Sequence, residues 1–415
     1  MHNLDHLTAD PGDVGLSKEG LARIARIAQT FVDEGQLAGA FTTVARRGKV
    51  VHFAPCGLMD IAAERPMADN AIFRIYSMTK PVAAVGVMIL LEEGKVDLDA
   101  PVAEYMPEFG GMKAVASPDD DEVVLVEPER EMTVRDLMRH TAGLPGANRY
   151  LAGQAAVDRL YREKGLDRFE DGDLADMVAK LGQIPLLYPP GCKWHYSVAA
   201  DVLGRLIEVI SGRGFDAFLQ ERIFQPLGMA DTDFYVPAEK LDRLVGMHGP
   251  DEVGKLRVID APQGGTGAIR PDAFTIKPSL LSAGGGLVST AADFTRFCLM
   301  LSNKGELLGT RLLQPESVEE MTRNQLPDEL VPLDKKPVER YEGLGFGLGV
   351  SVRVARTDWV PSSQVGEYGW IGGTSTEFWI SPQDELVSVV LAQHMPFSPL
   401  SEAVKPLVYA ALNPE

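Results

Sequence analysis

The chain has 415 residues, of which 45% are hydrophobic and 24% charged, values typical of a globular protein with a large buried core. Its formal net charge of −19 disfavours nucleic acids and anionic membrane surfaces as partners. No apolar run reaches the ~18 residues that a membrane-spanning helix requires. The first residues also lack the basic and apolar regions of a secretory signal, so we expect a cytoplasmic protein.

Cysteines and histidines offer no sign of a disulfide framework or a metal site. Cys56, Cys192 and Cys298 are widely spaced and form no Cys-x-x-Cys pair, which predicts three free, buried thiols. The seven histidines form no pair with the spacing of metal ligands. We therefore expect neither a metal nor another cofactor.

The first predicted elements are a helix, a hairpin and a buried helix. Ser17 can cap an amphipathic helix, and the strand-like runs 40–45 and 50–55 flank a turn. Residues 82–91 are apolar on every side, which predicts a helix buried all round.

The middle of the chain has a different character from its two ends. From about residue 96 to 280, short amphipathic helices alternate with loops rich in Pro and Gly. Within it, the acidic segment 117–131 predicts an exposed ribbon or insertion without a catalytic role. Helices return beyond residue 284, and the strand pair 375–380 and 386–393 precedes a final helix near 401–412.

This order predicts an α/β (α+β) unit built from both termini. We expect residues 1–95 and 285–415 to form that unit, and residues 96–284 to form a mainly helical domain packed against it. The active site is expected in the cleft between the two domains.

The segment Ser77-Met78-Thr79-Lys80 is the strongest candidate for chemistry. A serine and a lysine three positions apart on a helix share one face, so the amine of Lys80 can take the proton of the Ser77 hydroxyl. At a helix start, the backbone N–H of Ser77 can also stabilise an oxyanion. The pattern predicts an acyl-transfer nucleophile, although so short a motif arises by chance about once in such a chain.

Two further segments supply the groups that this chemistry needs. Tyr196 stands between a rigid Pro/Gly turn and an apolar helix, where it can share a proton with Lys80; a packing role is the alternative. The glycines before Thr374 leave the N–H of Gly373 free as a second oxyanion donor, or else mark a strand bulge. The glycine-rich segments 284–286 and 343–349 match no phosphate-binding loop and are interpreted as closely packed backbone.

A Ser-His-Asp triad is not expected. His140 and His195 are available, but the chain has no Gly-x-Ser-x-Gly segment. We interpret His140 as a structural histidine at a helix end.

Taken together, these segments resemble the serine β-lactamase/penicillin-binding superfamily, in particular class C β-lactamases and the family VIII carboxylesterases. The resemblance runs from about residue 15 to the C-terminus. Tyr196-Ser197-Val198 is similar to Tyr-x-Asn, and Trp370-Ile371-Gly372 takes the place of Lys-Thr-Gly. The resemblance implies an antiparallel sheet flanked by helices, with Ser77, Lys80 and Tyr196 as catalytic residues. Further family-like segments are 133–144, 226–229 and 283–297.

Departures from the β-lactamase pattern indicate the substrate. Val198 cannot make the hydrogen bond of the usual Asn, and Trp370 is apolar where β-lactamases carry a lysine. A site without these polar partners has little selectivity for a charged amide substrate such as a β-lactam. We therefore expect a serine carboxylesterase for short-chain acyl esters. Trp370, Ile371, Gly372 and Val198 are expected to line its substrate pocket.

Three alternatives remain open from the sequence. The same site could have β-lactamase activity or could transfer the acyl group to an alcohol or amine. From a different class, the chain could be a binding scaffold without catalysis, although the retained Ser77, Lys80 and Tyr196 argue against this. The expected partner is a small-molecule ester, and the sequence specifies no oligomeric state.

Overall fold

An eight-stranded antiparallel sheet forms the centre of the computed structural model, which describes residues 4–146, 153–166, 172–259, 274–331, 341–358 and 360–412. The strand order is β12-β13-β14-β15-β16-β1-β2-β3. Segments from the two ends of the chain meet where β1 pairs with β16. This arrangement confirms the predicted α/β fold with an antiparallel sheet. The strands are β1 (Gly39–Arg46), β2 (Lys49–Asp60), β3 (Arg65–Pro66), β12 (Leu344–Phe346), β13 (Ser351–Arg353), β14 (Tyr368–Gly372), β15 (Thr376–Ser381) and β16 (Leu386–Ala392).

The predicted hairpin is present as β1 and β2. Arg47 and Gly48 have φ values of 51° and 73°, the left-handed conformation that a tight two-residue hairpin turn requires at both positions. The second predicted pair is β15 and β16, whose connection is closed by a hydrogen bond of 2.7 Å from Ser381 Oγ to Asp384 Oδ2.

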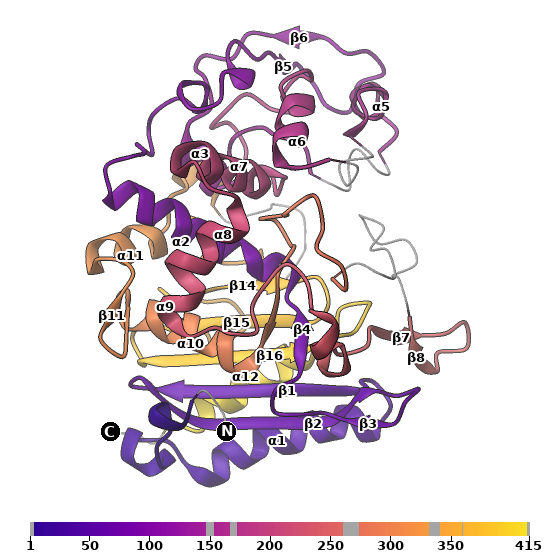
Figure 1. The fold of residues 1–415 in the computed structure, drawn as a ribbon, viewed down its shortest axis with the longest axis vertical. Helices are drawn as coiled ribbons and strands as arrows, with labels where there is room; N and C mark the ends of the chain where they lie inside the picture. The colour runs from indigo at the N-terminus through magenta and orange to yellow at the C-terminus, as the bar shows by residue number, and fades with distance from the viewer. Residues whose placement is uncertain are drawn as a thin grey trace.

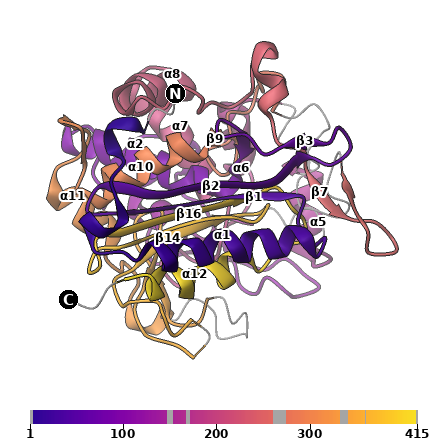
Figure 2. The ribbon, with the colours of Figure 1, turned by 90° about the horizontal axis from the view of Figure 1, so that it is seen from below.

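Helices α1 (Lys18–Asp33) and α12 (Leu400–Ala410) cover one face of the sheet (Figure 2). Ser17 caps α1 as expected, since its Oγ accepts a hydrogen bond of 3.2 Å from Gly20 N. A side chain on Gly20 would meet Ala411 at 2.7 Å, so the glycine allows the two helix ends to pack closely. The two terminal helices thus close this face together.

The opposite face carries the largest hydrophobic core and the helices α2 (Thr79–Glu92) and α10 (Ala291–Ser302). Every residue of α2 from Thr79 to Leu90 is buried, as the sequence predicts. The short ladder of β4 (Ile72–Arg74) with β9 (Val288–Thr290) leads directly into the start of α2.

The segment between α2 and β9 is mainly helical (Figure 1). Its first part, to about residue 211, lies beyond α2 on the side away from the sheet, whereas residues 225–227 pack against α10 and His248 N donates to Gln393 O just after β16. The acidic segment contributes β6, which pairs with β5 and leaves Val124 and Leu125 exposed, as expected. The elements of this segment are β5 (Ala114–Val115), β6 (Leu125–Val126), α3 (Val134–Met138), α5 (Ala156–Glu163), α6 (Leu174–Leu181), α7 (Ala199–Ser211), α8 (Phe215–Leu219), α9 (Gln225–Leu227), β7 (His248–Pro250) and β8 (Leu256–Val258). The ribbon β10 (Glu306–Leu307) and β11 (Thr310–Arg311) and the helix α11 (Pro315–Thr322) follow α10.

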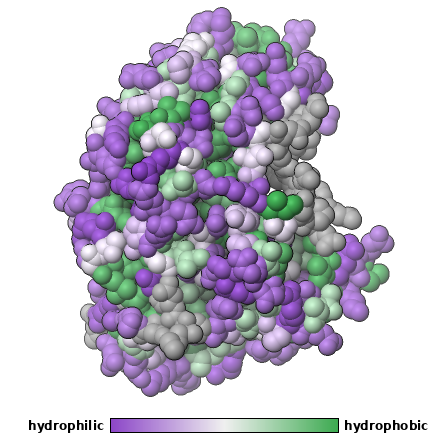
Figure 3. Space-filling model, in the orientation of Figure 1, coloured by the Kyte–Doolittle hydropathy of each residue, from purple (hydrophilic) through white to green (hydrophobic). Residues whose placement is uncertain are grey.

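The face shown in Figure 3 is mostly hydrophilic, in keeping with the charged composition. Within the described ranges, no helix has both the length and the apolar character needed to cross a membrane. All three cysteines are free, and burial raises the pKa of the Cys298 thiol. Of the three thiols expected to be buried, only Cys298 is fully so. Cys56 is half-buried, and Cys192 is exposed because it lies in the turn after Pro189.

Candidate active site

Ser77 lies in the 3₁₀ turn Tyr76–Met78 that joins β4 to α2, and it is partly exposed. The turn packs against the end of β14, where a side chain on Gly372 would meet Ile75 O at 2.4 Å. Gly372 therefore allows the strand to approach the backbone next to the candidate nucleophile. Tyr76 has a φ of 42°, an unfavourable conformation for a residue with a side chain.

Lys80 Nζ lies 3.2 Å from Ser77 Oγ, close enough for proton transfer between them. The same Nζ donates a hydrogen bond of 2.6 Å to the carbonyl of Gly284 and lies 4.5 Å from the centre of the Tyr196 ring. Lys80 is 6% exposed, so its amine is held in place by the protein and has little contact with solvent.

Tyr196 lies in the loop immediately before α7 and is surrounded by aromatic rings. Its ring centre is 4.8 Å from that of His140, 5.5 Å from that of Trp370 and 6.3 Å from that of Trp194. Trp370 Nε1 donates a hydrogen bond of 3.4 Å to the Tyr196 hydroxyl. The structure thus brings Ser77, Lys80 and Tyr196 together, as expected from the sequence.

His140 is a buried member of the aromatic cluster around Tyr196. It is 2% exposed, and its Nδ1 accepts a hydrogen bond of 3.4 Å from Ser197 N. Burial, and then the nearby charge of Lys80, lower the pKa of His140 well below its usual range. The ring is therefore neutral at physiological pH and adds no charge beside Lys80.

Gly373 lies in the exposed turn between β14 and β15, the strand end next to the Ser77 segment. The turn is tied to that segment because Thr374 Oγ1 donates to the carbonyl of Arg74 at 3.3 Å. Gln393 strengthens the link: its Oε1 accepts from Arg74 N at 2.9 Å, and its Nε2 donates to Arg74 O at 3.0 Å and to Thr374 Oγ1 at 2.9 Å.

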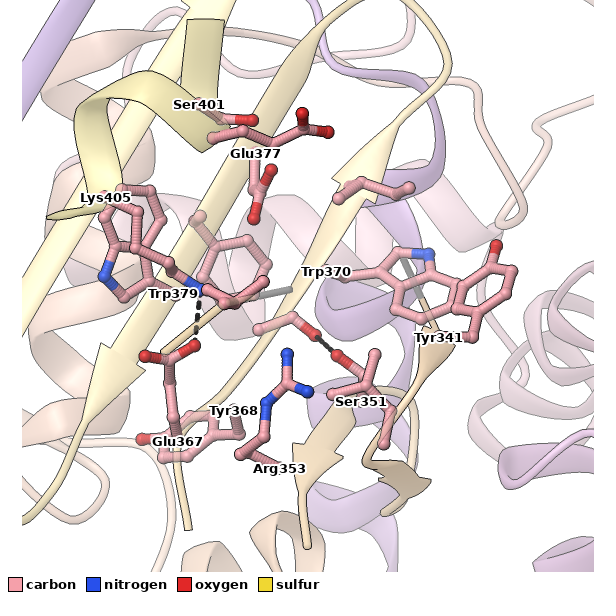
Figure 4. A pocket seen from close by; sticks show the side chains of 16 residues that line it. Tyr341, Ser351, Arg353, Glu367, Tyr368, Trp370, Glu377, Trp379, Ser401 and Lys405 are labelled. Atoms are coloured by element: carbon pink, nitrogen blue, oxygen red, sulfur yellow. Dashed lines mark hydrogen bonds and ion pairs between the residues drawn. The ribbon is translucent and has the colours of Figure 1, made fainter. Parts of the chain in front are cut away.

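The residues predicted to line the substrate pocket separate into two groups. Trp370 and Ile371 line a cavity of about 80 Å³ beside β14, where Figure 4 shows the Trp370 ring. Gly372 and Val198 do not line this cavity; Val198 is 6% exposed and packs in the core. Neither Ser77 nor Lys80 is among the described residues around the cavity. Trp370 links the two places, because it lines the cavity and its Nε1 bonds to the Tyr196 hydroxyl.

The cavity also contains charged side chains. Lys405 Nζ donates to Glu367 Oε1 at 2.5 Å, an ion pair that Figure 4 marks, and Arg353 lies nearby. In the part of the chain that the structure describes, no cluster of three or more His, Cys, Asp or Glu side chains could hold a metal ion.

Sequence analysis missed three residues that organise the site: Asp201, Gly284 and Gln393. Gly284 was assigned to closely packed backbone, but its carbonyl also binds Lys80. A backbone acceptor has no signature in a sequence because every residue has one. The available signal was Asp201, a charged residue in the first turn of the otherwise apolar start of α7.

Comparison with known proteins identifies the family of this chain. The beta-lactamase family model matches residues 24–412. Esterase EstB from Burkholderia gladioli is 31% identical over 417 residues, covering 97% of this chain and 98% of EstB. The solved structure of EstCE1, described as a hydrolase with promiscuous acyltransferase activity, aligns with a TM-score of 0.77 at 26% identity over 94% of this chain and 99% of EstCE1.

A more distant structure shows how widely the fold is shared. Unliganded simvastatin synthase from Aspergillus terreus aligns with a TM-score of 0.77 at 22% identity, over 95% of this chain and 99% of that protein. The matched residues begin within α1, end just after α12 and include Ser77, Lys80, Tyr196 and Gly373. On this match, the chain belongs to the beta-lactamase family.

Proposed function

We propose that this protein is a serine carboxylesterase that hydrolyses short-chain acyl esters through an acyl-enzyme on Ser77. The observation that carries the proposal is the placement of Lys80 Nζ, 3.2 Å from Ser77 Oγ and 4.5 Å from the centre of the Tyr196 ring. A base and a second proton-handling group thus stand beside one partly exposed serine hydroxyl.

In the proposed acylation step, Lys80 takes the hydroxyl proton while Ser77 Oγ attacks the ester carbonyl. The N–H groups of Ser77 and Gly373 stabilise the oxyanion, and loss of one such donor typically costs about 10²–10³-fold in rate. The carbonyl re-forms as the C–O bond to the alcohol breaks, and Tyr196 relays the proton from Lys80 to the leaving alkoxide. Water then attacks the acyl-enzyme with the same pair as base, releasing the acid and restoring Ser77.

Trp370 supports an ester substrate. Trp370 takes the position of the lysine in the β-lactamase pattern. It is 4% exposed, and its indole N–H points to the Tyr196 hydroxyl. This replacement removes a cation from the site, which suits an uncharged ester better than a substrate with a carboxylate.

Acyl transfer is the second candidate. EstCE1 is described as having promiscuous acyltransferase activity, and an alcohol can replace water in the deacylation step. Adding acceptor alcohols to the ester assay and analysing the products for new esters separates transfer from hydrolysis.

The active site is proposed to lie between the two predicted domains, 1–95 with 285–415 and 96–284. Ser77, Lys80 and Gly373 come from the first, whereas Tyr196 comes from the second. All eight strands of the described central sheet also come from the first range. A cytoplasmic location is proposed from the three free cysteines.

A panel of p-nitrophenyl esters of increasing chain length, assayed beside a chromogenic cephalosporin, tests the function. We expect turnover of short acyl chains and little hydrolysis of the cephalosporin. Ser77→Ala should abolish turnover with an unchanged melting temperature. Ser388 is a buried serine on β16, and Ser388→Ala should retain turnover. Ester turnover at the wild-type rate in Ser77→Ala, or no labelling of Ser77 by a fluorophosphonate, would exclude the proposal.

A further inference from the structure

The direction of the Lys80 amine depends on the carbonyl of Gly284. A neutral amine has two N–H bonds and one lone pair. When the Gly284 carbonyl accepts one N–H at 2.6 Å, the lone pair can face the Ser77 hydroxyl at 3.2 Å. A displaced carbonyl would allow the amine to rotate, and the lone pair would no longer face the proton that it has to accept.

The carboxylate of Asp201 holds the Gly284 segment in place. Asp201 Oδ1 accepts hydrogen bonds from Gly284 N at 2.9 Å and from Ser282 Oγ at 2.7 Å. Asp201 is 8% exposed, and bonds to an ionised acceptor are stronger than bonds between neutral groups. The loop is therefore fixed at two points on either side of residue 283.

Close packing adds a second constraint. A Cβ atom on Gly284 would lie 2.7 Å from Asp201 Oδ2, so the carboxylate rests directly against the backbone of the loop. Asp201 belongs to the first turn of α7, and Tyr196 lies in the loop just before that helix. One helix start thus positions both Tyr196 and the acceptor of Lys80.

We infer that Asp201 is a positioning residue: it fixes the Gly284 carbonyl and, through it, the orientation of the Lys80 amine toward Ser77. The inference rests on the proposed roles of Ser77 and Lys80. Among the described residues, Asp201 bonds to Ser282 and Gly284 and forms no hydrogen bond with Ser77 or Lys80.

Two measurements test the inference: the rate constant for fluorophosphonate labelling of Ser77, and kcat and KM for a p-nitrophenyl ester. In labelling, Ser77 Oγ displaces fluoride from phosphorus and its proton passes to Lys80, so the rate reports the activation of Ser77. Asp201→Ala should lower the labelling rate and kcat about 100-fold with KM nearly unchanged, because misplaced catalytic groups typically cost this much.

Two milder variants should give graded results. Asp201→Asn keeps an oxygen acceptor at the same place, so it should restore the labelling rate to within about tenfold of wild type. Ser282→Ala removes one of the two bonds to Asp201 and should give a smaller loss than Asp201→Ala.

Asp293→Ala is the matched control. Asp293 lies in the first turn of α10, and its Oδ2 accepts from Asp231 N at 2.7 Å and from Thr232 Oγ1 at 3.2 Å, the same kind of bonding as at Asp201. This control should lower the melting temperature but keep the labelling rate per folded molecule.

Wild-type labelling in Asp201→Ala, or an equal loss in Asp293→Ala, would overturn the inference. If Asp201→Ala does not fold, Gly284→Ala moves the loop from the other side, since its Cβ would press on the Asp201 carboxylate. Wild-type kinetics in Gly284→Ala would then overturn it. Ser77→Ala distinguishes failure of the proposed function from failure of the inference about Asp201. If that variant is still labelled at the active site, the proposed function fails whatever Asp201 does.

Discussion

The hydrogen bond from Trp370 to Tyr196 has a direct kinetic consequence. Trp370→Phe keeps an aromatic ring next to Tyr196 but removes the N–H that lies 3.4 Å from its hydroxyl. A net hydrogen bond is worth about 0.5–1.5 kcal/mol, so kcat should fall about two- to tenfold with little change in KM. Steady-state kinetics with a short-chain ester measure both.

Trp194→Phe is the control for this change. Trp194 also stacks against Tyr196, at 6.3 Å between ring centres, but its Nε1 has no hydrogen-bond partner among the described residues. We expect nearly wild-type kcat from Trp194→Phe. Equal losses in the two variants would mean that ring packing, and not the indole N–H of Trp370, is what matters.

At the scale of single residues, the sequence was sufficient for the groups with distinctive chemistry. Ser77, Lys80 and Tyr196 were found from their types and spacing, and the structure brings them together. Gly284 was missed because a backbone carbonyl acts whatever the residue type. The contact of Trp370 with Tyr196 was missed because it joins two residues 174 positions apart.

At the scale of elements, the buried amide of Gln393 helps Thr374 to hold the turn after β14 to the Ser77 segment. Gln393 is 2% exposed and bonds to both the N–H and the carbonyl of Arg74. Gln393→Leu removes these bonds and leaves the N–H of Arg74 without its acceptor, whereas the Arg74 carbonyl keeps the bond from Thr374 Oγ1. An unpaired polar group typically costs about 1–3 kcal/mol. We expect a lower free energy of unfolding and also a lower kcat, because the Gly373 N–H loses its support.

Ser388→Ala separates the two effects in that experiment. Ser388 lies on β16, which ends directly before Gln393. Its Oγ donates to Thr43 O at 3.0 Å, where β16 pairs with β1. Its removal should reduce stability without changing kcat in the folded enzyme. Chemical denaturation and ester hydrolysis together measure both quantities, and an unchanged kcat in Gln393→Leu would contradict the prediction.

The elements were largely predictable because their signals are local. The hairpin β1–β2, the buried helix α2 and the pair β15–β16 follow from hydrophobic patterns and turn residues. By contrast, β12 and β13 have three residues each, too few for a periodic pattern. Their place at the edge of the sheet depends on pairing with β14, which sequence patterns do not specify.

At the scale of the whole molecule, the buried His140 and His248 and the half-buried His52 predict acid sensitivity. Burial lowers the pKa of His52 and of His248 to about 4, and lowers that of His140 well below 6.5. Below about pH 6.5 the unfolded chain binds protons that the folded protein does not, so the free energy of unfolding falls as the pH drops. Each histidine contributes a slope of at most about 1.4 kcal/mol per pH unit.

Asp293 acts in the opposite direction. Burial raises its pKa from 3.8 to about 6, so the folded protein binds this proton first and gains stability as the pH falls through that range. One carboxyl group offsets only part of the effect of three histidines. Urea unfolding should therefore show lower stability at pH 5.5 than at pH 7.5, and equal stability would contradict this account.

His248→Gln tests the contribution of one histidine. Besides burial, the charge of Asp60 favours protonated His248, while His394 and Arg74 oppose it. Glutamine cannot titrate and can still accept a hydrogen bond from Ile61 N, which now lies 3.4 Å from His248 Nε2. The variant should lose less stability than the wild type between pH 7.5 and 5.5.

The pairing of β1 with β16 also determines when the fold can be completed during synthesis. Ser388 and Thr43 hydrogen-bond across 345 positions of sequence, so β1 has no partner on that side until β16 has left the ribosome. Pairings between such distant segments form slowly, and an unpaired strand edge can associate with other chains. Newly made chains should therefore depend on chaperones that shield β1 until the last strand arrives.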